Sequence, residues 1–301
     1  MADMNKFLRG IAFGALFLGA VSLACANEAL QLKRQDRKFL QATAYAPAAA
    51  TCRGIAIISP GAGGTEQGYR YLGEALSSLG YLSVVVGHQE SGRRALREHL
   101  RGNGLREGLA ELITEPDAYR GRFMDIAASM QWAEGRCNSS EKLLIGHSMG
   151  AATVMIEAGA KNKIGVSGTD SFNAYIALSP QGTGSIFPEN AWSGIRRPVL
   201  LITGTRDTEL GGASWETRTE PFRNMPPGCK WLGIMDGASH LNLQATGCHV
   251  RPRRSQCRLS AHFSMAFTRV TAVLGAESQA WIYQRSRFPR GQQPTRGNLM
   301  C

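Results

Sequence analysis

The chain has 301 residues, of which 43% are hydrophobic and 19% charged, and its formal net charge is +11. These values exclude a disordered or fibrous protein and fit one sizeable globular domain that needs neither metals nor dense cross-links to bury its core. No aromatic residues interleave the arginine-rich segment that begins at residue 93, and no nucleic-acid motif accompanies it. We therefore expect no nucleic-acid partner and only a weak attraction to anionic surfaces.

Residues 1–26 have the pattern of a secretory signal peptide. Basic residues precede an apolar stretch that is too short and too rich in small residues to span a bilayer, and Ala24 to Ala26 fit a cleavage site. We predict export to the periplasm or to the exterior, with residues 27–301 forming a single mature domain.

Export changes the interpretation of the cysteines. Seven are present, and removal of Cys25 with the leader leaves six, an even number that favours disulfides in an oxidising compartment. The sequence leaves their pairing open. Cys52 and Cys137 each precede an apolar strand, and Cys248 and Cys257 flank a short basic loop, so these are the two pairs that we favour.

Short apolar runs then alternate with helical patterns along the chain. This rhythm predicts an α/β domain whose mostly parallel, twisted sheet carries helices on both faces. The segment 89–116 is long for a connection, and we interpret it as a candidate cap or lid. Strands are expected at 37–47, 54–59, 81–87, 142–146, 174–180, 198–204 and 229–237, and helices at 66–80, 117–135, 149–160 and 261–275.

A G-x-S-x-G pattern lies between the expected strand at 142–146 and the helix that follows it. Such a pattern gains weight at a strand-to-helix turn, where a strained backbone presents a serine hydroxyl at the carboxyl ends of the strands. Ser148 is therefore the candidate nucleophile. Gly146 and Gly150 would support the turn, because larger side chains on either side of the serine would collide.

A serine nucleophile needs a base, and the base needs a carboxylate to orient it. Asp207 follows the next-to-last expected strand and His240 lies in the loop after the last one. The chain order serine, aspartate, histidine is the one that this architecture requires. Asp236 is a less favoured acid, and His88 is a less favoured base because the sequence offers it no carboxylate.

Acyl transfer also needs N–H donors for a tetrahedral oxyanion. Met149 directly follows the serine and should supply one donor, and Ala62 in the glycine-rich turn at 59–64 should supply the other. Trp192 and Trp215 are candidate walls of an acyl pocket, with a place in the core as the alternative for each. No metal or cofactor site is expected.

The motifs SPGAGG, GHSMGAA, LITGTRD and MDGASH, together with a closing helix at 267–282, resemble the α/β-hydrolase superfamily. Within it, the chain is similar to the branch of dienelactone-hydrolase-like, platelet-activating-factor-acetylhydrolase-like and cutinase-type polyesterase proteins. The resemblance implies a serine carboxylic-ester hydrolase with an acyl-enzyme intermediate and without a metal. The substrate would be a small-molecule, lipid or polymer ester.

Two other functions remain open from the sequence. One is a lipase or polyester hydrolase that works at an interface. The other is a non-catalytic binding protein on a hydrolase scaffold, against which the intact serine, histidine and aspartate argue.

Overall fold

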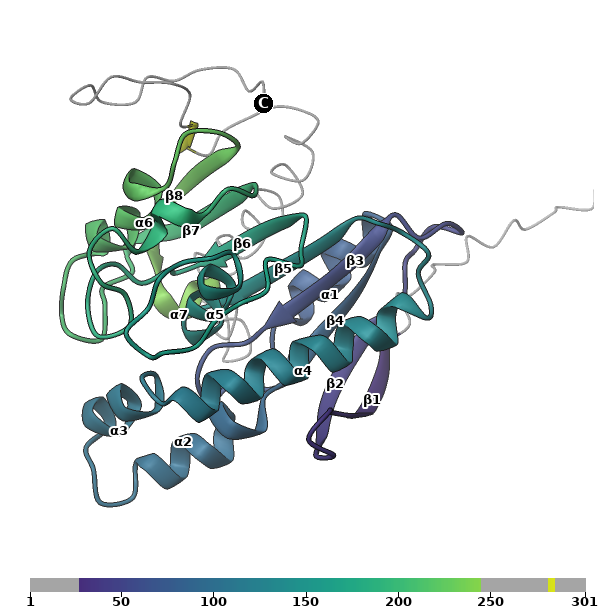
Figure 1. Ribbon diagram of the computed structural model, residues 1–301, viewed down its shortest axis with the longest axis horizontal. Coiled ribbons are helices and arrows are strands. Elements are labelled where there is room, and N and C mark those ends of the chain that lie inside the picture. The colour runs from purple at the N-terminus through teal and green to yellow at the C-terminus, as the bar shows by residue number, and fades with distance from the viewer. Residues whose placement is uncertain (1–26, 245–280, 285–301) are drawn as a thin grey trace, which may run out of the picture.

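The computed structural model describes residues 27–244 and 281–284, which form one mixed sheet with helices on both faces (Figure 1). The sheet has nine strands in the order β1-β2-β4-β3-β5-β6-β7-β8-β9. The strands are β1 (Asn27–Lys33), β2 (Phe39–Tyr45), β3 (Gly54–Ser59), β4 (Tyr81–Gly87), β5 (Lys142–His147), β6 (Ala174–Leu178), β7 (Val199–Arg206), β8 (Lys230–Ser239) and β9 (Trp281–Gln284).

Seven α-helices and three short 3₁₀ helices connect these strands within the described residues. They are α1 (Arg70–Ser78), η1 (Gln89–Ser91), α2 (Arg93–His99), α3 (Leu105–Leu112), α4 (Pro116–Glu134), α5 (Met149–Glu157), η2 (Ala191–Gly194), η3 (Trp215–Thr219), α6 (Glu220–Asn224) and α7 (His240–Leu243).

The central strands β3 to β8 run parallel to one another, whereas β1, β2 and β9 join the sheet antiparallel. Parallel strands are buried on both faces, which explains why their sequences are continuous apolar runs. In β3, Ile55 and Ile57 belong to one core, and Ala56 and Ile58 belong to the core on the opposite face. The carboxyl ends of these strands meet along one edge, where α/β proteins place their ligands.

The two cores lie under different helices. Figure 1 shows α4 and α5 in front of the sheet and α1 behind it. Tyr119 and Ile126 of α4 pack in the first core with much of α5, and Leu72 and Leu76 of α1 pack in the second. This arrangement confirms the predicted α/β fold, in which helices cover both faces of one sheet.

Most expected elements are confirmed, and three expectations need correction. β3 and β4 have the expected bounds, but β1 was not expected, because its alternating polar residues suit an edge strand that carries little signal. His240 begins a short helix, α7, rather than lying in a loop. Residues 281–284 form a strand and not the end of a helix, and the rest of the expected closing helix lies outside the described residues.

A disulfide joins Cys52 to Cys137, as the sequence predicted, with the two Cα atoms 5.6 Å apart. It links the segment before β3 to the segment after α4. Cys229 has a free thiol. The favoured pair of Cys248 and Cys257 lies outside the described residues, as does the segment 1–26 that was expected to be a signal peptide.

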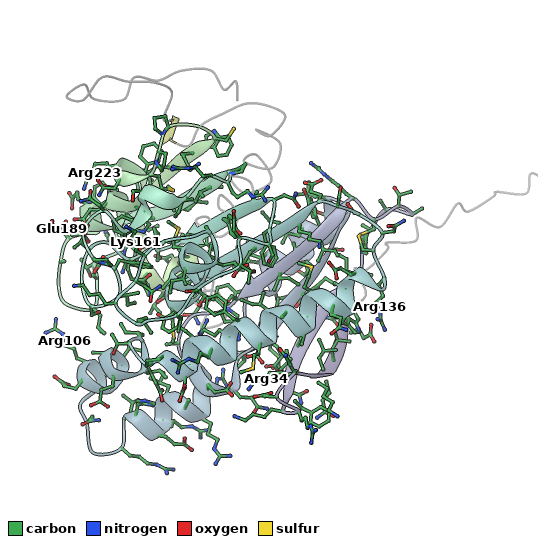
Figure 2. All side chains as sticks on the ribbon, in the orientation of Figure 1. Arg34, Arg106, Arg136, Lys161, Glu189 and Arg223 are labelled. Atoms are coloured by element: carbon green, nitrogen blue, oxygen red, sulfur yellow. A yellow bond between two sulfur atoms is a disulfide. The ribbon has the colours of Figure 1, made fainter. Side chains whose placement is uncertain are left out.

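The segment 89–116 contains η1, α2 and α3 and stands beside the sheet rather than on it (Figure 1). No residue of α2 is buried, and α3 buries only Gly108 and Leu112. Arg106 of α3 reaches the loop after β7, where its Nε donates to the Leu210 carbonyl at 2.9 Å (Figure 2). The role of the segment 89–116 as a cap stays a prediction.

Among the helices in 27–244, none has the length and apolarity that a bilayer crossing requires.

Candidate active site

Ser148 lies on a sharp turn between β5 and α5, as the pattern around it predicted. Its backbone has φ 55° and ψ −118°, a conformation that residues with a side chain rarely adopt and that costs about 1–3 kcal/mol. The Ser148 N–H donates to the Leu178 carbonyl of β6 at 2.9 Å, which helps to hold the turn. The side chain is half-buried at the carboxyl end of the sheet.

The glycines on either side of Ser148 are required by space. A Cβ on Gly146 would lie 2.1 Å from the carbonyl oxygen of Gly150, and a Cβ on Gly150 would lie 2.0 Å from that of Ser59. Neither separation is possible without moving backbone. The structure therefore supports the predicted role of both glycines in packing the turn.

Asp207 and His240 are hydrogen-bonded, with 2.8 Å between Asp207 Oδ1 and His240 Nδ1. The carboxylate is fully buried, whereas a third of the histidine side chain is exposed. Thr203 donates to the other carboxylate oxygen at 3.0 Å. Because an ionised carboxylate only accepts, the imidazole proton lies on Nδ1, which leaves Nε2 as a free base.

Arg218 of η3 adds a buried cation to this pair. Its Nε lies 2.9 Å from Asp207 Oδ1, and its Nη2 lies 3.4 Å from His240 Nδ1. Burial raises the pKa of Asp207, but the hydrogen bond from His240 and the charge of Arg218 outweigh burial and bring the pKa below its ordinary value. The carboxylate therefore stays ionised at neutral pH.

The ring of His240 lies against His147, the residue before Ser148, with 4.7 Å between the ring centroids. The structure thus brings the serine turn and the Asp207–His240 pair together. No hydrogen bond joins the Ser148 hydroxyl to the His240 ring within 27–244. Asp236, the alternative acid, accepts instead from Thr205 at 3.0 Å and lies within β8.

The turn at 61–64 leaves one backbone donor unused. Gly61 N–H donates to the Tyr69 hydroxyl, Gly63 N–H to the Ser91 carbonyl and Gly64 N–H to the Gly61 carbonyl. The Ala62 N–H has no acceptor among the described residues. The Met149 N–H, at the first position of α5, has none there either, as is usual for the start of a helix. The sequence analysis expected these two N–H groups to be the oxyanion donors, and that role stays a prediction.

A second serine, histidine and aspartate are also connected. His88 Nε2 lies 2.9 Å from Ser59 Oγ, and His88 Nδ1 lies 2.9 Å from Asp125 Oδ2. The expectation that His88 lacks a carboxylate was therefore wrong. Ser59 is nevertheless fully buried at the end of β3, where its hydroxyl also accepts from Arg122, and no solvent reaches it. Its position excludes Ser59 as a nucleophile for an external substrate.

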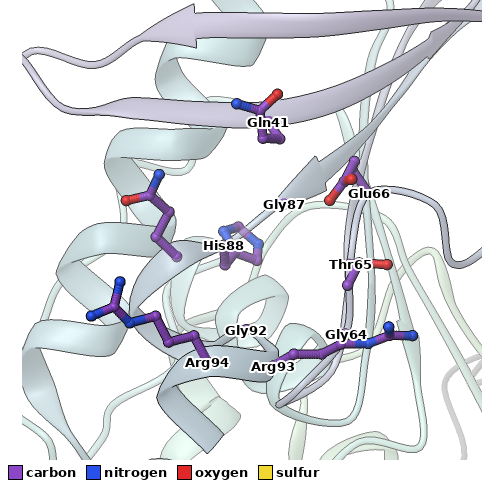
Figure 3. A pocket seen from close by; sticks show the side chains of 10 residues that line it. Gln41, Gly64, Thr65, Glu66, Gly87, His88, Gly92, Arg93 and Arg94 are labelled. Atoms are coloured by element: carbon purple, nitrogen blue, oxygen red, sulfur yellow. The ribbon is translucent and has the colours of Figure 1, made fainter.

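His88 also lines a cavity of about 340 Å³ (Figure 3), and neither Ser148 nor His240 is among the residues that line it. The two tryptophans that were expected to wall a pocket do not line it. Trp192 is fully buried beside Phe187, which agrees with the core alternative, whereas Trp215 is half-buried at the start of η3. The other residues that line the cavity are Gln41, Gly64, Thr65, Glu66, Gly87, Gln89, Gly92, Arg93 and Arg94.

Sequence reasoning missed the buried side chains that hold the site together. Arg218, Arg122 and Tyr69 carry no motif, and each comes from a segment distant from its partners in the chain. A fully buried arginine leaves no pattern that periodicity can detect. In the part of the chain that the structure describes, no three histidine, cysteine or carboxylate side chains are arranged to hold a metal ion.

No protein-family model matches the chain. Curated relatives include Cutinase 2 of Thermobifida cellulosilytica and a cutinase of Thermobifida fusca strain YX, each 26% identical over 200 residues, or 66% of this chain. The match spans 64% of the first relative and 53% of the second.

Solved structures with the same architecture include a protein assigned as a dienelactone hydrolase from Klebsiella pneumoniae, with a TM-score of 0.55 and 14% identity. An esterase domain from Rhodothermus marinus has a TM-score of 0.51 and 16% identity. Each likeness covers 81% of this chain and 99% of the solved one. At such low identity the likeness is one of fold, and it confirms the predicted fold class.

Proposed function

Because the chain has the α/β-hydrolase fold and resembles the cutinase and dienelactone-hydrolase-like branch of that superfamily, we propose that it is an exported serine hydrolase of carboxylic esters. The observation that carries the proposal is the strained turn at Ser148, beside a histidine that is hydrogen-bonded to a buried aspartate. The disulfide between Cys52 and Cys137 supports export, because disulfides persist in oxidising compartments.

The reaction begins when His240 Nε2 takes the proton of Ser148 and the serine oxygen attacks the ester carbonyl carbon. The ionised Asp207 stabilises the imidazolium that forms. The carbonyl oxygen becomes an oxyanion that accepts hydrogen bonds from the Ala62 and Met149 N–H groups. The dipole of α5, whose N-terminus begins at Met149, adds to this stabilisation.

The tetrahedral intermediate then collapses. Its bond to the alcohol oxygen breaks, His240 gives its proton to that oxygen, and the acyl group stays on Ser148. In the second half, water replaces the alcohol. His240 removes a proton from the water as it attacks the acyl carbon, and returns a proton to Ser148 as the carboxylic acid leaves.

A polyester or lipid ester is a second candidate substrate class. Its support is the similarity to cutinases and the exposure of Leu241, which follows His240 and leaves 61% of its surface open. Leu105 on α3 is 70% exposed in the candidate cap. A series of p-nitrophenyl esters of increasing chain length separates the two classes. A preference for short soluble chains without activation at an interface contradicts the lipase or polyesterase alternative.

Substitution of the serine tests the proposed reaction. Ser148→Ala should lower kcat on p-nitrophenyl butyrate by at least about 10³-fold. Because alanine is smaller and the strained turn is kept, the circular dichroism spectrum and Tm should match the wild type. Retention of the wild-type rate by Ser148→Ala contradicts the proposed role of Ser148. Ser59→Ala is the matched control for loss of a serine at the other hydrogen-bonded histidine, and it should keep ester cleavage well above that of Ser148→Ala.

A further inference from the structure

The peptide between Pro60 and Gly61 is held at both of its polar atoms by buried side chains. The Pro60 carbonyl accepts from Arg122 Nη1 at 2.8 Å, and the Gly61 N–H donates to the Tyr69 hydroxyl at 3.3 Å. Arg122 belongs to α4 on one face of the sheet, and Tyr69 precedes α1 on the other face (Figure 1). The peptide is therefore hydrogen-bonded by side chains that come from opposite faces of the sheet.

Tyr69 is fixed in turn by His147. The hydroxyl lies 2.7 Å from His147 Nδ1, and His147 Nε2 lies 3.2 Å from the carbonyl oxygen of His240. A carbonyl only accepts, so the ring proton lies on Nε2 and the Tyr69 hydroxyl donates to Nδ1. Burial, with the nearby His240, holds the pKa of His147 well below its usual range, so the ring stays neutral. The lone pairs of the tyrosine oxygen then face Gly61.

Arg122 is fixed by hydroxyl groups. Its Nε donates to Ser91 Oγ at 2.9 Å and its Nη1 donates to Ser59 Oγ at 3.1 Å. Burying a guanidinium completely is costly unless its donors are used, and Nη2 has no partner among the described residues. The guanidinium is nevertheless buried, and it donates to the Pro60 carbonyl and the Ser59 hydroxyl of the turn at 59–64.

Gly61 makes such restraint necessary. A Cβ at this position would lie 3.2 Å from Ser148 Cβ, a tighter contact than side chains usually make, so a glycine at residue 61 eases the close approach of the turn to the serine. Glycine also permits rotations of the neighbouring peptides that other residues forbid. Rotation of the Pro60–Gly61 peptide would also reorient the next peptide, which carries the Ala62 N–H.

We propose that Arg122 and Tyr69 are positioning residues that clamp the Pro60–Gly61 peptide and thereby aim the Ala62 N–H at the oxyanion. The clamp rests on the proposed function, in which that N–H stabilises the transition state. The Gly61 carbonyl, which accepts from Gly64 N–H at 3.0 Å, completes the arrangement by holding the other end of the same peptide as the Ala62 N–H.

Tyr69→Phe removes one oxygen and keeps the buried ring, so it tests the clamp with little change in packing. We expect kcat on p-nitrophenyl butyrate to fall about 10- to 100-fold, less than the loss of a whole oxyanion donor, with KM within about twofold. Tyr175→Phe is the matched control, because the buried Tyr175 hydroxyl also makes two hydrogen bonds, to Asp170 and Phe172. It should keep the wild-type kcat.

Affinity for a transition-state mimic distinguishes positioning from general destabilisation. A boronic acid that adds to Ser148 places an oxygen where the oxyanion forms, so its Ki should rise in Tyr69→Phe by about the factor by which kcat falls. Arg122→Lys, which keeps the charge but cannot reproduce the contacts of the guanidinium, should act in the same direction.

Three results have different meanings. Wild-type kcat and Ki in Tyr69→Phe, with Ser148→Ala inactive, overturn the clamp and leave the proposed function intact. A loss of kcat in Tyr69→Phe that only follows a loss of folded protein, with Ki unchanged, also overturns the clamp. An active Ser148→Ala overturns the proposed function itself.

Discussion

At the scale of single residues, the candidate site depends on a few polar atoms, each of which contacts two partners. Asp207 Oδ1 accepts from His240 and lies 2.9 Å from Arg218 Nε, and the Tyr69 hydroxyl donates to His147 and accepts from Gly61. The sequence supplied the residues with motifs, Ser148, Asp207 and His240, and it missed the side chains that hold them. The reason is physical, because a motif reports local backbone geometry whereas these contacts form only when distant segments pack.

A single buried residue, Asp125, should make the free energy of unfolding depend on pH. Burial raises its pKa to about 7, although Arg34 at 3.1 Å opposes this rise (Figure 2). The other neighbours of Asp125 are His88, Glu90 and Arg122, and among them only Glu90 also raises the pKa of Asp125. The unfolded chain has a pKa near 3.9 at this residue, so the folded protein binds more protons between about pH 4 and pH 7. The free energy of unfolding should therefore fall as pH rises through this window.

Asp125→Asn removes this contribution, so the free energy of unfolding should vary less between pH 4 and pH 7 than in the wild type. Urea denaturation at several pH values measures the difference. Asp117→Asn, an exposed carboxylate on the same helix, is the control and should leave the pH dependence unchanged. Identical pH dependence in Asp125→Asn and the wild type would show that Asp125 is ionised across the window.

At the scale of elements, the sequence predicts best where one physical signal dominates. β3 and β4 are continuous apolar runs buried on both faces, and both have their expected bounds. β1 pairs only with β2 at the sheet edge, and its alternating residues carried too little signal to be expected. The helix α7 is too short for periodicity, and a Ser239–Asn242 capping box defines it instead.

The disulfide gives an element-scale prediction, because it joins the entry of β3 to the exit of α4 across 85 residues of chain. Replacing both Cys52 and Cys137 by serine frees this loop in the unfolded state. The free energy of unfolding should fall by about 2–5 kcal/mol, measured by urea denaturation, while kcat stays the same. Cys229→Ser, which removes a free thiol, is the control. A double variant as stable as this control contradicts the expected contribution.

At the scale of the whole molecule, the sheet brings the ends of separate strands to one edge. The turn after β3, the elbow after β5, the aspartate after β7 and the histidine after β8 come together there. The alternation of apolar runs and helical patterns along the chain sufficed to predict the fold class, which the solved structures confirm. The resemblance to the cutinase and dienelactone-hydrolase-like branch rested on four short motifs, and it agrees with the similarity to cutinases and to a dienelactone hydrolase structure. The shape of the acyl pocket could not be predicted, because loops and the segment 89–116 form their contacts only in the folded molecule.

The central claim is that Ser148 is the nucleophile, and covalent labelling tests it most directly. A fluorophosphonate reacts with a serine that an adjacent base activates. Mass spectrometry of the digested, labelled protein should find one adduct, on the peptide that contains Ser148, and Asp207→Asn should slow its formation. An adduct on another serine, such as Ser59, or the absence of any adduct from the folded wild-type protein would contradict the account.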